Sequence, residues 1–172
     1  DLVISTGRAD WDNYFVTFGN NFGVDPNVLV LQAIQESSLN PNAVSAKGAR
    51  GIAQFMPATA KRFGVNVNNV PSSIEGQAKY MSFLLSMFGG DYSKALAGYN
   101  AGEGAVQRYG GIPPFKETQK YVNKIKNAYS SRVKKGSSYG TYDFASDDGT
   151  LPNVPGEVFD TLDLASREKA ID

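Results

Sequence analysis

Residues 25–39 read DPNVLVLQAIQESSL, and this stretch decides the fold. Asp25 is a favoured N-cap residue and Pro26 is favoured at the first helical position, so we predict that a helix begins here. The helix is expected to end near Leu39, because Pro41 follows closely and disfavours helical backbone. Apolar residues fill most of the helix circumference, which is typical of a helix at the centre of a core.

Glu36 lies in the last turn of this predicted helix. Carboxylates are rare in apolar surroundings, and the negative end of the helix dipole opposes their ionisation. Both effects are expected to raise the pKa of Glu36 and to keep a proton available for general acid catalysis. A solvated carboxylate at a helix end is the ordinary alternative, and sequence position alone favours it.

The rest of the N-terminal part predicts four or five helices in all and no sustained strand. Ser72 and Glu75 have the spacing of a capping box, Asp91 is an expected N-cap, and residues 40–55 are expected to form an ordered loop. The further helices are predicted from Pro57 to Gly64, from Ser72 to Gly89-Gly90, from Asp91 to Asn100, and from about Glu117 to Val133.

Residues 1–135 are therefore expected to form one mostly α-helical domain. From Gly136 onward the chain turns to Gly, Ser, Asp, Pro and Tyr without a sustained period. We interpret 136–172 as an irregular, extended C-terminal tail or linker, in which a short helix near 157–170 is the one candidate element.

The amino-acid composition excludes several kinds of catalytic and metal sites. The 172 residues include no cysteine and no histidine, so disulfides, thiolate nucleophiles, Cys/His zinc sites and Ser-His-Asp triads are excluded. An acid/base catalyst must then be Asp, Glu, Lys or Tyr. Seventeen basic residues balance seventeen acidic ones, which gives no electrostatic reason to expect nucleic acid as a partner. No apolar run approaches the length of a membrane span.

Three motifs resemble one enzyme family. Residues 36–60 read ESSLNPNAVSAKGARGIAQFMPATA, residues 96–102 read LAGYNAG, and residues 117–122 read ETQKYV. In this order they resemble the signature of the lysozyme-like lytic transglycosylases, the soluble-transglycosylase (SLT) catalytic domain. The resemblance implies a lysozyme-like helical fold of the goose-type lysozyme/SLT kind. Ala53 and Gly98 are smaller than the residues common in the family, and we expect them to widen the cleft wall.

The resemblance also implies roles for individual residues. Glu36 would be the general acid that protonates the glycosidic oxygen and then the base that deprotonates a sugar hydroxyl. The substrate-binding residues would be Ser45, Gly51, Gln54, Met56, Tyr99, Asn100 and Tyr121, with the Tyr121 hydroxyl reaching Glu36. Most of them have an ordinary alternative: side-chain-to-backbone bonding for Ser45 and Gln54, a positive-φ turn for Gly51, a core position for the tyrosines, and gap filling for Met56.

Most glycosidases use two carboxyl groups, but the signature segment supplies no second acid after Glu36. Asp91 is expected to be a helix cap, Glu103 to lie in a loop, and Glu117 to open the last helix. By resemblance, the chain is then a peptidoglycan lytic transglycosylase with Glu36 alone, which leaves 1,6-anhydromuramoyl ends and needs no metal or cofactor. A hydrolytic goose-type lysozyme and a catalytically silent peptidoglycan-binding module remain the alternatives.

The resemblance implies peptidoglycan glycan strands as the partner. It places the chain outside the cytoplasm, in the periplasm, in the cell wall or secreted, or in a virion. Domains of this kind also occur in larger wall-penetrating machines of secretion, conjugation and phage entry.

Overall fold

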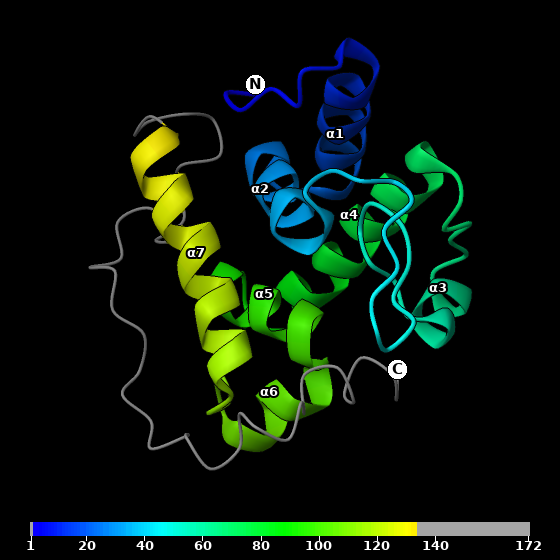
Figure 1. The fold of residues 1–172 in the computed structure, drawn as a ribbon. Coiled ribbons are helices and arrows are strands. Elements are labelled where there is room, and N and C mark those ends of the chain that lie inside the picture. Colours follow the sequence, from blue (N-terminus) through cyan, green and yellow to red (C-terminus); the bar gives the residue numbers. More distant parts are fainter. Residues whose placement is uncertain (1, 134–172) are drawn as a thin grey trace.

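The computed structural model describes residues 2–133 (Figure 1). This part of the chain is mostly α, as predicted, and its only β pairing is two isolated bridges, Val44 with Arg50 and Arg50 with Phe55. The predicted tail at 136–172 lies outside the described residues. The helices are α1 (Ala9–Phe22), α2 (Pro26–Ser37), α3 (Pro57–Arg62), α4 (Val70–Met87), α5 (Tyr92–Ala101), α6 (Glu103–Tyr109) and α7 (Lys116–Arg132).

Helix α2 is the buried central helix that the sequence predicts. Its first eight residues, from Pro26 to Ala33, are all buried, and the Asp25 side chain caps it by accepting a hydrogen bond from the Asn27 N–H. The helix ends at Ser38, which has left-handed backbone. Glu36 therefore lies in the last turn, and it is half-buried.

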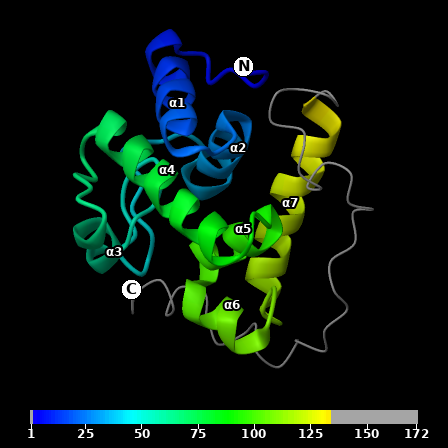
Figure 2. The same cartoon turned by 180° about the vertical axis from the view of Figure 1, so that it is seen from behind.

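Four of the other helices surround α2 (Figures 1 and 2). Helices α1 and α7 pack on it from two sides, while α4 and α5 run behind it (Figures 1 and 2). The completely buried side chains include one from each of these helices, namely Phe15, Leu29, Met81, Leu96 and Val122. Burying one such side chain contributes roughly 1.5–3 kcal/mol. Within residues 2–133, no helix is long and apolar enough to cross a membrane.

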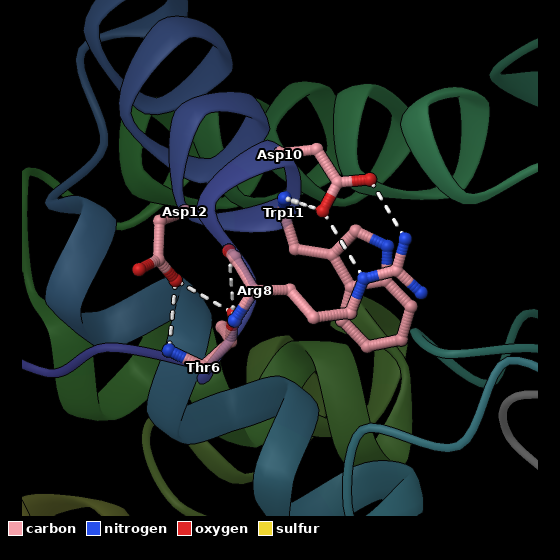
Figure 3. Close-up of polar contacts among 5 residues, drawn as sticks. All are labelled: Thr6, Arg8, Asp10, Trp11 and Asp12. Carbon is pink, nitrogen blue, oxygen red and sulfur yellow. Dashed lines mark hydrogen bonds and ion pairs between the residues drawn. The ribbon is translucent and has the colours of Figure 1, made fainter.

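Helix α1 was not predicted, because its N-terminus lacks a side-chain cap. Arg8 occupies the N-cap position and makes no capping hydrogen bond. Instead, the carboxylate of Asp12 accepts hydrogen bonds from the Thr6 N–H and hydroxyl at 2.7 and 2.6 Å (Figure 3). Arg8 forms an ion pair with Asp10 and stacks its guanidinium 4.4 Å from the Trp11 ring centroid. These contacts hold the residues that precede the helix. A search for an N-cap side chain does not detect them.

Two predictions about helix starts were wrong. Helix α4 begins at Val70 and not at a Ser72–Glu75 capping box, since the Asn69 side chain accepts the Ser72 N–H at 2.8 Å. Glu103 does not lie in a loop, because it opens the short helix α6 directly after Gly102. The Asp91 cap of α5 is confirmed, with its carboxylate accepting the Lys94 N–H at 3.0 Å.

A buried polar network joins α2, α5 and α7. The Tyr129 hydroxyl donates to the Asp25 carboxylate at 2.5 Å, and the Asp25 N–H donates to the Tyr92 hydroxyl at 3.0 Å. Asp25 is completely buried, so these partners supply the hydrogen bonds that water would otherwise make. The network fixes the register of α7 against α2, and these two helices face each other across the candidate site.

Candidate active site

A cavity of about 360 Å³ opens beside the last turn of α2. Its walls come from α2, from the 40–56 segment, from the end of α5 and from one face of α7. The lining residues are Gln35, Glu36, Ser45, Lys47, Ala49, Gln54, Met56, Asn100, Glu117, Lys120, Tyr121 and Lys124. Six predicted site residues lie in this wall, whereas Gly51 and Tyr99 do not.

Glu36 and Tyr121 meet inside the cavity. The Tyr121 hydroxyl donates to the Glu36 carboxylate at 2.8 Å, which joins α7 to α2 across 85 residues of sequence. Burial, together with the nearby charge of Glu36, raises the pKa of the Tyr121 hydroxyl well above its ordinary value. Tyr121 therefore keeps its proton at any ordinary pH and acts as a fixed donor to the Glu36 carboxyl group.

Two glutamines support this pair from the core, and sequence reasoning missed both. Gln32 lies one turn before Glu36, and its side chain lies near the Tyr121 hydroxyl. Gln77 of α4 donates to the Gln32 side-chain oxygen at 2.7 Å and to the Leu29 carbonyl at 3.0 Å. Both glutamines are completely buried, which is rare for this residue type. A glutamine four residues before Glu36 on an apolar helix was the available signal.

The 40–56 segment is held by its own side chains. Ser45 accepts the Ala49 N–H through its hydroxyl oxygen at 2.9 Å. The Gln54 amide donates to the Ala43 and Gly51 carbonyls at 3.1 and 2.8 Å. Ser45 and Gln54 thus line the cavity while their side chains also stabilise the loop, as the ordinary alternative anticipates.

Backbone strain concentrates around the catalytic candidate. Among the residues that the structure describes, the non-glycine positions with positive φ are Ser38, Leu39 and Gln54. Such conformations cost of order 1–3 kcal/mol each and persist only where surrounding contacts enforce them. The Ser37 hydroxyl provides one such contact by donating to the Ile52 carbonyl at 2.7 Å. This hydrogen bond therefore joins the turn after Glu36 to the 40–56 segment.

Gly51 lies close to another segment of this chain, and its contact with a sugar stays a prediction. It is buried with φ at 84°, and a Cβ atom there would lie 2.6 Å from the Val67 carbonyl oxygen. The close approach that requires glycine is thus between two segments of this chain. The positive-φ alternative describes Gly51 correctly.

Tyr99 belongs to the core and not to the cavity wall. Its ring is almost completely buried, and its hydroxyl donates to the Ala53 carbonyl at 2.8 Å. Ala53 and Gly98 are buried as well and do not line the cavity, so the expectation that they widen the cleft was wrong. A Cβ atom on Gly98 would contact Leu84 at 2.9 Å, which points to helix packing.

The acidic residues outside α2 separate into two kinds. Glu103 forms an ion pair with Arg62 at 2.8 Å and accepts the Tyr80 hydroxyl at 2.7 Å, away from the cavity lining. Glu117 does line the cavity, and the Asn100 amide lies 3.4 Å from its carboxylate. Glu117 is therefore the second carboxyl group of the site, contributed by α7. No cluster of three or more metal-ligating side chains occurs within residues 2–133.

Comparison with known proteins identifies the family. Residues 13–122 match the transglycosylase SLT domain. The chain is 32% identical over 135 residues to membrane-bound lytic murein transglycosylase D of Escherichia coli, which covers 67% of this chain and 30% of that protein. It is 36% identical over 106 residues to peptidoglycan transglycosylase gp16 of Escherichia phage T7, covering 57% of this chain and 8% of gp16.

Solved structures agree with this assignment. The 70 kDa soluble lytic transglycosylase Slt70 of Escherichia coli superposes with a TM-score of 0.62 at 25% identity, over 69% of this chain and 23% of Slt70. An inactive Glu-to-Gln variant of the Pseudomonas aeruginosa lytic transglycosylase Slt gives a TM-score of 0.60 at 26% identity, over 70% of this chain and 23% of that one. The chain thus spans less than a third of each of these relatives. It belongs to the transglycosylase SLT domain family.

Proposed function

We propose that this chain is a peptidoglycan lytic transglycosylase that cleaves the bond between N-acetylmuramic acid and N-acetylglucosamine, with Glu36 as its single general acid and base. The observation that carries the proposal is the Glu36 carboxyl group, half-buried at the wall of a cavity and held there by the Tyr121 hydroxyl at 2.8 Å. The names of the relatives, lytic murein and peptidoglycan transglycosylases, support the same substrate.

The proposed reaction proceeds in two steps with one carboxyl group. Glu36 first donates its proton to the glycosidic oxygen, and the bond from that oxygen to C1 of the muramoyl residue breaks. The carbonyl oxygen of the muramoyl N-acetyl group stabilises C1 from the opposite face. Glu36, now ionised, takes the proton of the C6 hydroxyl, and O6 bonds to the cationic C1 on the face that the glycosidic oxygen has left. The products are a free 4-hydroxyl and a 1,6-anhydromuramoyl end, and water is not consumed.

Glu117 is the alternative second carboxyl group, and hydrolysis would be its consequence. In an inverting or retaining hydrolase it would activate water or attack C1. The Asn100 amide contacts the Glu117 carboxylate, and its oxygen accepts a hydrogen bond from the Thr118 hydroxyl at 2.7 Å. These contacts are typical of a residue that holds the cavity wall in place. We therefore assign Glu117 a positioning role, and Ser45, Gln54, Met56 and Asn100 contacts to the sugar rings.

Mass spectrometry of the products tests this proposal directly. Purified peptidoglycan is digested with the chain, and the released muropeptides are weighed. Anhydro ends, each lighter by one water than a reducing end, are the expected result. Reducing ends would instead identify a goose-type lysozyme activity, and the absence of any released product would identify a silent binding module.

Replacing Tyr121 by phenylalanine is expected to lower the rate of muropeptide release about 10- to 100-fold. The change removes a hydrogen bond to a charged group, worth about 1.5–3 kcal/mol, from the residue that performs both proton transfers. Initial rates on purified peptidoglycan measure the effect, and Tyr14→Phe on α1 is the matched control. Equal rates for the two variants would contradict a role for the Tyr121 hydroxyl.

We further propose that the chain acts outside the cytoplasm or as part of a virion. The similarity to a membrane-bound bacterial enzyme and to a phage protein supports these two settings alike. Association with a larger wall-penetrating machine is compatible with both.

A further inference from the structure

One face of α7 brings two lysines into the cavity wall. Glu117, Lys120, Tyr121 and Lys124 all line the cavity, and their spacing of three and four residues places them on a single helix face. With a rise of about 1.5 Å per residue, Lys120 and Lys124 lie about 1.5 and about 4.5 Å along the helix axis from Tyr121. The two lysines thus lie on either side of Tyr121 along the helix axis.

These lysines have an unusual electrostatic setting. Both are exposed, and neither forms an ion pair with any residue in the described part of the chain. Like charges four residues apart on a helix repel each other. The cavity is lined by three lysines, Lys47, Lys120 and Lys124, and by two carboxyl groups, those of Glu36 and Glu117. The lysines outnumber the carboxylates, and Lys120 and Lys124 form no ion pair within residues 2–133, so an arriving anion can bind to these two lysines.

We propose that Lys120 and Lys124 bind carboxylate groups of the stem peptide attached to the muramoyl residue at the cleaved bond. This inference rests on the proposed function for the identity of the substrate. In a peptide-bearing strand the sugars and the amide-linked lactyl groups carry no charge, whereas the attached peptide carries carboxylates close to the reacting sugar. The lysines would then make the chain prefer peptide-bearing strands over peptide-free strands.

The experiment compares two substrates, two double variants and one control variant. Parent protein and the double variant Lys120→Gln/Lys124→Gln are assayed on peptide-bearing glycan strands and on strands stripped of peptide by an amidase, whose freed lactyl carboxylates are then converted to neutral methylamides. We expect kcat/KM of the double variant to fall about fivefold on peptide-bearing strands and to stay within about twofold on stripped strands. The double variant Lys120→Arg/Lys124→Arg should keep the preference, and Lys61→Gln, an exposed lysine of α3 outside the cavity lining, is the matched control.

Salt and binding give independent readouts. The preference of the parent protein for peptide-bearing strands should disappear at about 0.5 M NaCl, because exposed ion pairs are screened. Co-sedimentation with both kinds of strand measures the same preference without cleavage, so it tests the lysines even if the parent protein cleaves neither substrate and the proposed function fails. A Gln double variant that keeps the parent's preference in binding and in cleavage, or loses both substrates equally, overturns the proposal.

Discussion

The Glu36→Gln variant is expected to release muropeptides about 10²–10⁴-fold more slowly than the parent protein, which is the contribution of a general acid and base. Glutamine has nearly the same shape as glutamate and its amide oxygen can still accept the Tyr121 hydroxyl, so the cavity should keep its structure. The amide cannot, however, donate a proton to the glycosidic oxygen or take one from the C6 hydroxyl. Initial rates on purified peptidoglycan measure the loss.

The decisive comparison is with Glu117→Gln, because Glu117 is the other carboxyl group of the cavity. If Glu36 acts alone, the Glu117→Gln variant should lose less than about tenfold, the cost of one hydrogen bond at the wall. Two variants that are equally inactive would show a two-carboxylate mechanism and would refute the single-residue proposal. Thermal unfolding and co-sedimentation with peptidoglycan establish that both variants fold and still bind.

The helices differ in how far the sequence predicts them. Helix α2 was predicted correctly from its Asp25 cap, from Pro26 and from its nearly all-apolar circumference. The local cap and the buried side chains both indicate a helix at the same place. Helix α1 has an amphipathic pattern but begins at an uncapped Arg8, and the contacts of Asp12 that fix its start come from residues before the helix. Helix α6 is a seven-residue segment directly after Gly102, too short for a periodic signal.

The candidate site was also predicted only in part. Motif resemblance gives six of the residues that line the cavity, among them Tyr121 as a partner of Glu36, but it does not give Lys120 or Lys124. It cannot separate them from Tyr99 and Gly51, whose motif positions serve internal contacts with Ala53 and Val67. Gln32 and Gln77 lie outside the three motifs and act through the tertiary contact of α2 with α4, which no local pattern reports.

The Gly51→Ala variant is expected to lower the free energy of unfolding by about 2–4 kcal/mol and to reduce activity as well. Two costs combine: an alanine must adopt φ near 84°, and its Cβ would lie 2.6 Å from the Val67 carbonyl oxygen, a backbone atom that cannot turn aside. The loop must then move. Its displacement reaches Glu36, because the next residue, Ile52, accepts the Ser37 hydroxyl at 2.7 Å.

Gly48→Ala is the matched control for this prediction. Gly48 has φ at 97° in the same loop, but a Cβ atom there meets nothing within 4 Å. It therefore adds backbone strain of about 1–2 kcal/mol without a clash. Urea unfolding and initial rates, measured for both variants, should rank Gly51→Ala well below Gly48→Ala in both quantities. Equal losses of stability and rate in the two variants would mean that backbone strain alone explains the effect of Gly51→Ala. The close approach of Gly51 to Val67 would then not position the turn that carries Glu36.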